Sequence, residues 1–193
     1  MLDALPRAAR HGLTILLIGL MLSGCAALST RPKPVLPSLR LAPKALGHEL
    51  AVQQQLRFQF GPHTRTLDAM LEVDAHEVRL LVQAMGQTGV RVFWDGQQLQ
   101  QQRADWLPAS VRAERVLDDL QFSLWPVAAI RAALPASWSV RESAGHRELV
   151  RDGKVWLAVT RVAPDRMQLV NHAENYSVEI ASIASDAAAS EQP

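Results

Sequence analysis

Short segments in which apolar and polar residues alternate recur through most of the chain, and they constrain its fold more than any other feature. Between residues 56 and 60, Leu, Phe and Phe alternate with Arg and Gln. Side chains two residues apart lie on one face of a β-strand, so this pattern predicts strands with one apolar face. Asp95-Gly96 and Asp152-Gly153 are typical of hairpin turns. The other segments of this kind are 67–73, 78–84, 90–94, 98–103, 138–142, 146–151, 155–159, 166–172 and 176–180.

Residues 110–134 interrupt the alternation and have the spacing of helices instead. Ser110 suits the N-cap of a first helix, and Pro126 suits the first turn of a second one, which Pro135 would end. The predicted fold is therefore mainly β (α+β), a curved antiparallel sheet or incomplete β-barrel of about ten strands with a central helical insert. Such an insert would partly cover the concave face of the sheet, where an apolar ligand can bind.

The first residues have the pattern of a bacterial lipoprotein signal. Arg7 and Arg10 precede an apolar run over 13–22, which is shorter than the roughly 20 residues needed to cross a bilayer. The run ends in the lipobox Leu-Ser-Gly-Cys at 22–25, and Cys25 is the only cysteine of the chain. Since a thiolate is a good nucleophile for an acyl-glyceryl group, we expect lipidation at Cys25. The alternative is a chance cysteine in an ordinary signal peptide.

The sequence as a whole predicts four regions. Residues 1–24 are expected to be a cleaved signal peptide, and residues 25–49 the lipidated cysteine and a Pro-rich, semi-rigid tether. Residues 50–183 contain the predicted strands and form the domain, and residues 184–193 are a small, polar tail expected to be disordered. Ala26 follows the cysteine at a position where Asp typically signals inner-membrane retention. We therefore expect the protein at the outer membrane, lipid-anchored and facing the periplasm.

Charge, cysteine content and motifs exclude several classes of function. The formal net charge of +1 is too small for a field that holds nucleic acid. One cysteine excludes an intrachain disulfide and a cysteine-rich zinc site. The chain contains no G-x-S-x-G, H-E-x-x-H or G-x-x-x-x-G-K motif. We therefore expect no enzyme activity, no cofactor and no metal site.

Two polar clusters remain as candidates for chemistry. Asp118-Asp119 is predicted to lie on a solvated face of the helical insert, with an acid/base pair as the alternative. The cluster at 171–175, which holds Asn171 and Glu174, is predicted to be a turn between the last two strands, with a ligand or catalytic site as the alternative.

The tryptophans bear on where an apolar ligand would bind. Tryptophan combines a large apolar area with one hydrogen-bond donor, so it suits either a core or a lipid-lined cavity, and the core is the more common place. Trp125 is the best cavity candidate, because it precedes Pro126 in the insert that would cover the open side. The other cavity candidates are Phe58, Phe60, Val73, Leu81 and Phe93.

Three stretches of the chain resemble a known family. They are 71–96, 119–134 and Asn171 with 176–180. Together with the lipobox and the order of strands, helices and strands, they resemble the LolA/LolB fold of lipoprotein carriers. More specifically, the chain is similar, over roughly residues 50–183, to a LolB-like lipoprotein family of uncharacterised function (domain of unknown function number 3261).

The resemblance implies a lipid-handling step at the outer membrane. Genes of the family typically lie beside enzymes that make aryl polyene lipids, a LolA-like carrier and an exporter. The implied partners are a lipid or acylated cargo, a periplasmic LolA-like carrier and an inner-membrane exporter. LolB inserts lipoproteins with the help of an apolar residue on the loop between its third and fourth strands. The matching loop here is 84–89, where Met85 is the candidate for membrane insertion; a strand end without that role is the alternative.

Three functions remain open. The first is a non-enzymatic, lipid-anchored periplasmic protein that binds or transfers acyl or polyene chains, or an acylated protein, in its concave cavity. The second is a structural or docking lipoprotein that scaffolds an envelope lipid exporter with a filled core. The third is an enzyme that acts on a lipid product.

Overall fold

A computed structural model describes residues 33–107 and 111–183. Almost all of them belong to the second of two compact units, Val35–Pro193. The expected signal peptide, Cys25 and the expected tail at 184–193 lie outside the described residues. Within the described ranges, no helix is both long and apolar enough to cross a membrane.

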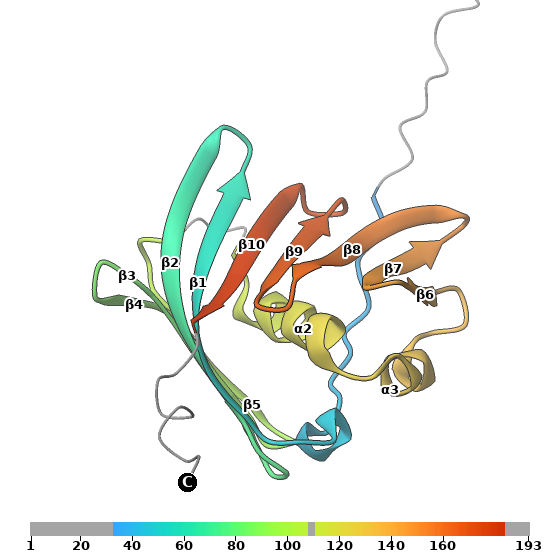
Figure 1. Cartoon of the computed structure of the whole chain (residues 1–193), viewed down its shortest axis with the longest axis horizontal. Helices are drawn as coiled ribbons and strands as arrows, with labels where there is room; N and C mark the ends of the chain where they lie inside the picture. Colours follow the sequence, from blue (N-terminus) through green and yellow to red (C-terminus); the bar gives the residue numbers. More distant parts are fainter. Residues whose placement is uncertain (1–32, 108–110, 184–193) are drawn as a thin grey trace, which may run out of the picture. The chain divides into compact units, whose positions relative to one another are not determined.

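Ten antiparallel strands form one open sheet in the order β5-β4-β3-β2-β1-β10-β9-β8-β7-β6 (Figure 1). The strands are β1 (Leu50–Phe60), β2 (His63–Val73), β3 (Val78–Ala84), β4 (Gln87–Trp94), β5 (Leu99–Arg103), β6 (Ser139–Ser143), β7 (His146–Arg151), β8 (Lys154–Ala163), β9 (Arg166–Asn171) and β10 (Tyr176–Ile183). The first and last strands pair at the centre of the sheet, where Leu56 lies opposite Ile180. The expectation of a mainly β fold with antiparallel strands around a helical insert is confirmed.

Tight turns join several neighbouring strands. Asp152 and Gly153 have φ angles of 52° and 73° between β7 and β8. Positive φ at both central residues defines a type I′ turn, which matches the twist of a hairpin. The turn predicted at Asp152-Gly153 is therefore confirmed. Asp95 also begins a turn, because its Oδ1 accepts hydrogen bonds from the backbone N–H groups of Gln97 and Gln98 at 2.8 and 2.7 Å.

Two helices, α2 (Ala113–Leu124) and α3 (Val127–Ala133), lie between β5 and β6, and α2 crosses the concave face of the sheet (Figure 1). Ser110 lies outside the described residues, and the residue at the N-cap of α2 is Arg112. Pro126, predicted in the first turn of the second helix, lies at the N-cap of α3, directly before its first residue. Arg147 of β7 holds the end of α2, since its Nη1 donates to the backbone oxygen of Trp125 at 2.8 Å.

Residues 35–46, called the strap below, form an integral part of the folded unit. The strap ends in a short 3-10 helix, η2 (Pro43–Leu46). Its buried leucines belong to the same hydrophobic core as the sheet and α2; they are Leu36, Leu39, Leu41 and Leu46. Leu41 is fixed at both backbone groups, because its N–H donates to Gln121 Oε1 at 3.0 Å and its oxygen accepts from Gln121 Nε2 at 2.8 Å. The Pro-rich segment expected as a tether over 25–49 is therefore packed against the domain from the strap onward.

Candidate functional site

A cavity of about 870 Å³ lies between the concave face of the sheet and α2. This volume falls within the roughly 300–1,000 Å³ of typical ligand pockets. Strands β1 to β4, β9 and β10 supply most of its apolar wall, and α2 supplies the facing side. The apolar side chains of the wall include Leu56, Phe58, Phe60, Leu67, Ala69, Leu80, Val82, Val90, Val116, Leu120, Leu124, Met167, Leu169, Val178 and Ile180.

The cavity exists because only one end of the concave face is filled. Along β2, Ala69, Leu71 and Val73 are buried, whereas Leu67 is half-buried and residues 63–66 are exposed. The strap reaches the filled end, where Trp94 Nε1 donates to the backbone oxygen of Leu41 at 2.7 Å. Apolar side chains toward the other end keep the strand alternation but are only partly buried, and they form the cavity wall opposite α2.

A buried polar cluster stands in this apolar wall. Arg115 and Asp119 of α2 and Tyr176 of β10 all line the cavity. Arg115 Nε donates to Asp119 Oδ1 at 2.8 Å, and the Tyr176 hydroxyl donates to Asp119 Oδ2. The Phe58 and Tyr176 rings contact each other, with their centroids 5.4 Å apart. The cluster thus joins α2 to the central strands at a point where a ligand would touch it.

Burial changes the acid–base behaviour of this cluster. It raises the pKa of Asp119 to about 6, because removal of water disfavours the carboxylate more than Arg115 and the Tyr176 hydroxyl favour it. Burial and the adjacent Asp119 charge raise the pKa of Tyr176, so its hydroxyl stays a donor. Burial lowers the pKa of Arg115, but Asp119 and Asp118 outweigh that effect and raise the pKa overall. The cluster therefore holds one permanent cation and one carboxyl group that titrates near neutrality.

Two large apolar side chains lie exposed at the edge of the cavity. Met85 is 93% exposed and Trp106 is 47% exposed, and both line the cavity. Met85 and Gly86 have φ angles of 49° and 75°, so they form a type I′ turn between β3 and β4. Trp106 packs over Gly89, where an added Cβ would lie 3.2 Å from the indole ring. Apolar surface is therefore presented to the surroundings where a ligand would enter.

Of the six residues expected to line a cavity, the structure brings Phe58 and Phe60 to the cavity wall. Trp125 is fully buried in the core, where its Nε1 donates to the backbone oxygen of Ala42 at 3.0 Å. Val73 faces the same side of the sheet but is packed in the core at the filled end. Neither Trp125 nor Val73 reaches the cavity, because the strap and α2 cover the filled end of the concave face.

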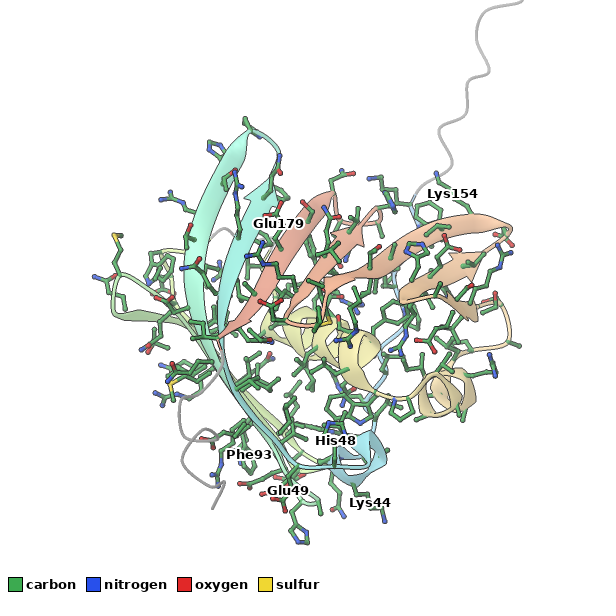
Figure 2. All side chains as sticks on the ribbon, viewed as in Figure 1. Lys44, His48, Glu49, Phe93, Lys154 and Glu179 are labelled. Carbon is green, nitrogen blue, oxygen red and sulfur yellow. The ribbon has the colours of Figure 1, made fainter. Side chains whose placement is uncertain are left out.

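Leu81 and Phe93 lie on the other face of the sheet. Leu81 alternates with buried Leu80 and Val82, and Phe93 alternates with buried Val92 and Trp94. Figure 2 shows Phe93 on the side of the sheet turned away from α2. Both faces of these strands carry apolar residues, so alternation alone does not identify the concave one.

The prediction of a solvated face at Asp118-Asp119 is wrong, because both side chains are buried. The cavity cluster of Arg115, Asp119 and Tyr176 was not expected from the sequence. One signal was present: Arg115 and Asp119 are four residues apart, the spacing of an ion pair on one helix face. The turn predicted at 171–175 is confirmed between β9 and β10. Asn171 is 1% exposed there, and its Oδ1 accepts from Glu174 N–H at 2.8 Å.

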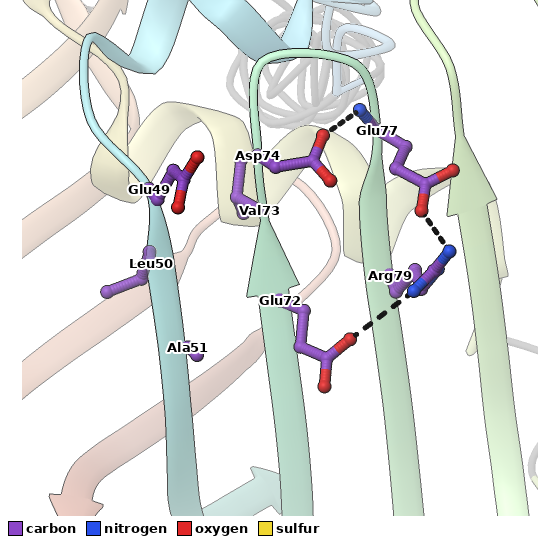
Figure 3. Close-up of a pocket in the computed structure, with 8 residues that line it drawn as sticks. All are labelled: Glu49, Leu50, Ala51, Glu72, Val73, Asp74, Glu77 and Arg79. Carbon is purple, nitrogen blue, oxygen red and sulfur yellow. Dashed lines mark hydrogen bonds and ion pairs between the residues drawn. The ribbon is translucent and has the colours of Figure 1, made fainter.

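A smaller pocket of about 280 Å³ lies near the turn between β2 and β3 (Figure 3). Four of its five charged side chains have partners, and Glu49 is the fifth. Asp74 Oδ1 accepts hydrogen bonds from the N–H groups of His76 and Glu77, and Arg79 pairs with Glu72 and Glu77. Across the described part of the chain, no group of three or more His, Cys, Asp or Glu side chains is placed to hold a metal. This pocket is therefore a surface cluster of mostly paired charges.

Comparison with known proteins gives one family. No curated protein matches the chain. A family model described as "Protein of unknown function (DUF3261)" matches residues 51–184. The match covers both halves of the sheet, the two helices and every described residue that lines the cavity. The chain therefore belongs to the DUF3261 family of proteins of unknown function.

Proposed function

We propose that this protein is a lipid-anchored, outer-membrane lipoprotein of the LolB type that binds an acyl or polyene chain in the cavity between α2 and the sheet. The observation that carries the proposal is the cavity itself, whose wall is mostly apolar. Transfer of a methylene group from water into such a wall contributes about 0.8 kcal/mol, so a long chain would bind without any covalent step. The proposal requires neither a cofactor nor a catalytic residue.

Met85 supports the membrane side of this proposal. Its positive φ is unfavourable for a side chain of its size, and at 93% exposure it gains little from packing. Asn or Asp followed by Gly is the favoured sequence for such a turn. An apolar side chain at this position is unfavourable both for the turn and for solubility, and contact with an apolar partner would explain its presence. We propose that Met85, together with Trp106, touches the membrane while the ligand passes.

Native mass spectrometry of the full chain carrying Cys25→Ser, produced in the periplasm of its own host, tests the proposal. The expected result is a population that carries an acyl or polyene species, which would also identify the cargo. A mass without ligand, and no uptake of added lipid from vesicles, would contradict lipid binding. That outcome would favour a docking lipoprotein that scaffolds an exporter.

A further inference from the structure

The arginine in the cavity wall has unused hydrogen-bonding capacity. Arg115 is 5% exposed and lines the cavity. Among the described residues, its guanidinium makes one hydrogen bond, from Nε to Asp119 Oδ1 at 2.8 Å, and its Nη1 lies 3.8 Å from Asp118 Oδ2. A guanidinium carries five N–H donors. Because an arginine is seldom buried without partners for these donors, the site fits a ligand that supplies oxygen acceptors.

The charges around Arg115 limit what that ligand can be. Asp119 balances Arg115, and Asp118 is balanced by Arg40, whose Nη1 lies 2.8 Å from Asp118 Oδ1. Near the rim, Arg112 pairs with Glu174 at 2.6 Å. The buried groups around Arg115 are therefore neutral in sum, whereas Arg65 also lines the cavity but from an exposed position on β2. A ligand that brought a permanent negative charge, such as a phosphodiester, would add an uncompensated charge in a medium with little water.

A carboxylic acid avoids that cost, because it brings its own proton. Resting on the proposed function, we infer that the cavity takes a long-chain carboxylic acid whose carboxyl group binds between Arg115 and Asp119. The Nη groups of Arg115 donate to the ligand oxygens, and the ligand proton is shared with the Asp119 carboxylate. The Asp119 oxygens have lone pairs beyond those used by Arg115 and Tyr176. The total charge of the site is the same before and after binding, and no bond other than the hydrogen bonds forms or breaks.

The raised pKa of Asp119 agrees with this geometry. Burial raises the pKa of Asp119 to about 6, so a proton shared between Asp119 and the ligand is held near neutral pH. The charged and titratable groups that face Asp119 are Arg115 and Asp118 from α2, Tyr176 from β10 and Glu174 from the turn before β10. Arg115 and Tyr176 favour the carboxylate, whereas Asp118 and Glu174 disfavour it. Binding of the acid is therefore expected to weaken as the pH rises from 5.5 to 8.5, and binding of an uncharged ester is expected to stay constant.

Palmitic acid and methyl palmitate, compared on the full chain carrying Cys25→Ser, test the inference. Each would displace the neutral fluorescent probe N-phenyl-1-naphthylamine from the cavity at pH 6. The expected result is at least tenfold tighter binding of the acid than of the ester. Equal binding of the two would overturn the carboxyl site while leaving lipid binding intact. If neither compound displaces the probe or binds, the proposed function itself fails.

A variant and a measurement on the unmodified site complete the test. Arg115→Gln with Asp119→Asn keeps hydrogen-bonding groups at both positions and removes both charges, so it should bind acid and ester equally. Arg57→Gln with Glu179→Gln removes an exposed ion pair of β1 and β10 that is not part of the cavity wall; this double variant is the matched control and should keep the preference for the acid. With palmitic acid labelled with carbon-13 at its carboxyl group, NMR should show a bound carboxyl whose titration midpoint differs from that of the acid in lipid vesicles. A bound carboxyl that titrates as it does in vesicles would overturn the inference even if the double variant does not fold.

Discussion

Asp118 and Asp119 are consecutive residues of α2 that bind different parts of the structure. Asp118 Oδ1 accepts hydrogen bonds from the backbone N–H of Leu39 at 3.1 Å and from Arg40 Nη1 at 2.8 Å, and so holds the strap. Asp119 faces the cavity and Tyr176. Arg115 lies between the two carboxylates, 2.8 Å from Asp119 Oδ1 and 3.8 Å from Asp118 Oδ2. Arg115 therefore lies near both the carboxylate that holds the strap and the carboxylate that lines the cavity.

The strap should be needed for stability. Asp118→Ala removes the acceptor of Leu39 N–H, Ser38 Oγ and Arg40 Nη1. A buried N–H without a partner and a broken, partly buried ion pair are expected to lower the free energy of unfolding by about 2–4 kcal/mol. Urea unfolding followed by circular dichroism measures the change. Asp165→Ala, at an exposed carboxylate 3.9 Å from Arg166, is the control and should change stability by less than about 0.5 kcal/mol. Similar effects of the two variants would show that the strap contributes little.

Stability should depend on pH through Asp119. Burial raises its pKa from 3.8 to about 6, so folding favours the protonated form. The resulting stabilisation is complete below pH 3.8 and is lost as the pH rises through 6. Compared with Asp119→Asn, which does not titrate, the wild-type protein should lose up to about 3 kcal/mol between pH 4 and pH 7. Urea titrations of both proteins at a series of pH values measure this difference. A difference that stays constant with pH, or that grows in the opposite direction, would contradict the burial effect.

Replacement of Met85 should separate stability from membrane contact. Met85→Asn creates the Asn-Gly pair that suits a type I′ turn, and no packing is lost at a side chain that is 93% exposed. The free energy of unfolding should rise by about 0.5–1 kcal/mol, since a larger side chain is unfavourable at positive φ. The same variant should bind phospholipid vesicles more weakly in a flotation assay. Val162→Asn, at another exposed apolar residue away from the cavity, is the control. Unchanged vesicle binding by Met85→Asn would remove Met85 from the proposed membrane contact.

A larger side chain inside the cavity should block the ligand. Leu67 is half-buried on β2 and lines the cavity, so Leu67→Trp fills part of its volume. The amount of lipid that copurifies, or the affinity for an added acyl chain, should fall by about tenfold, equal to about 1.4 kcal/mol. Leu81→Trp places the same residue at a half-buried leucine on the opposite face and should leave binding unchanged. Equal losses in both variants would indicate general misfolding, and no loss in either would place the ligand elsewhere.

The strands and turns were predictable because their signals are local. Strand β2 extends over His63–Val73, and the segment predicted from alternation, 67–73, is its apolar half. The missing half, 63–66, has exposed side chains on both faces and therefore lacks the apolar period. Asp152-Gly153 was predictable for a similar reason, since positive φ at two consecutive positions selects these residue types directly.

The residues that line the cavity were predictable only in part. Phe58 and Phe60 were expected there and lie there, whereas Trp125 was the leading candidate and is a core residue. The sequence around Trp125 does not show that the backbone oxygen of Ala42, 83 residues away, accepts a hydrogen bond from its indole N–H. Leu81 and Phe93 were misplaced for a different reason, because β3 and β4 carry apolar side chains on both faces.

By itself, the sequence determined the period-two strands, the hairpin turns and the break for two helices, since each depends on the conformational preferences of a few adjacent residues. Only the tertiary structure decided which face became concave, where the strap packed and which polar groups were buried. Asp118 meets Leu39 across 79 residues of sequence, and Asp119 meets Tyr176 across 57. Burial of a carboxylate depends on such distant partners, because only they replace the water it loses. The polar cluster in the cavity therefore forms only when the sheet packs against α2.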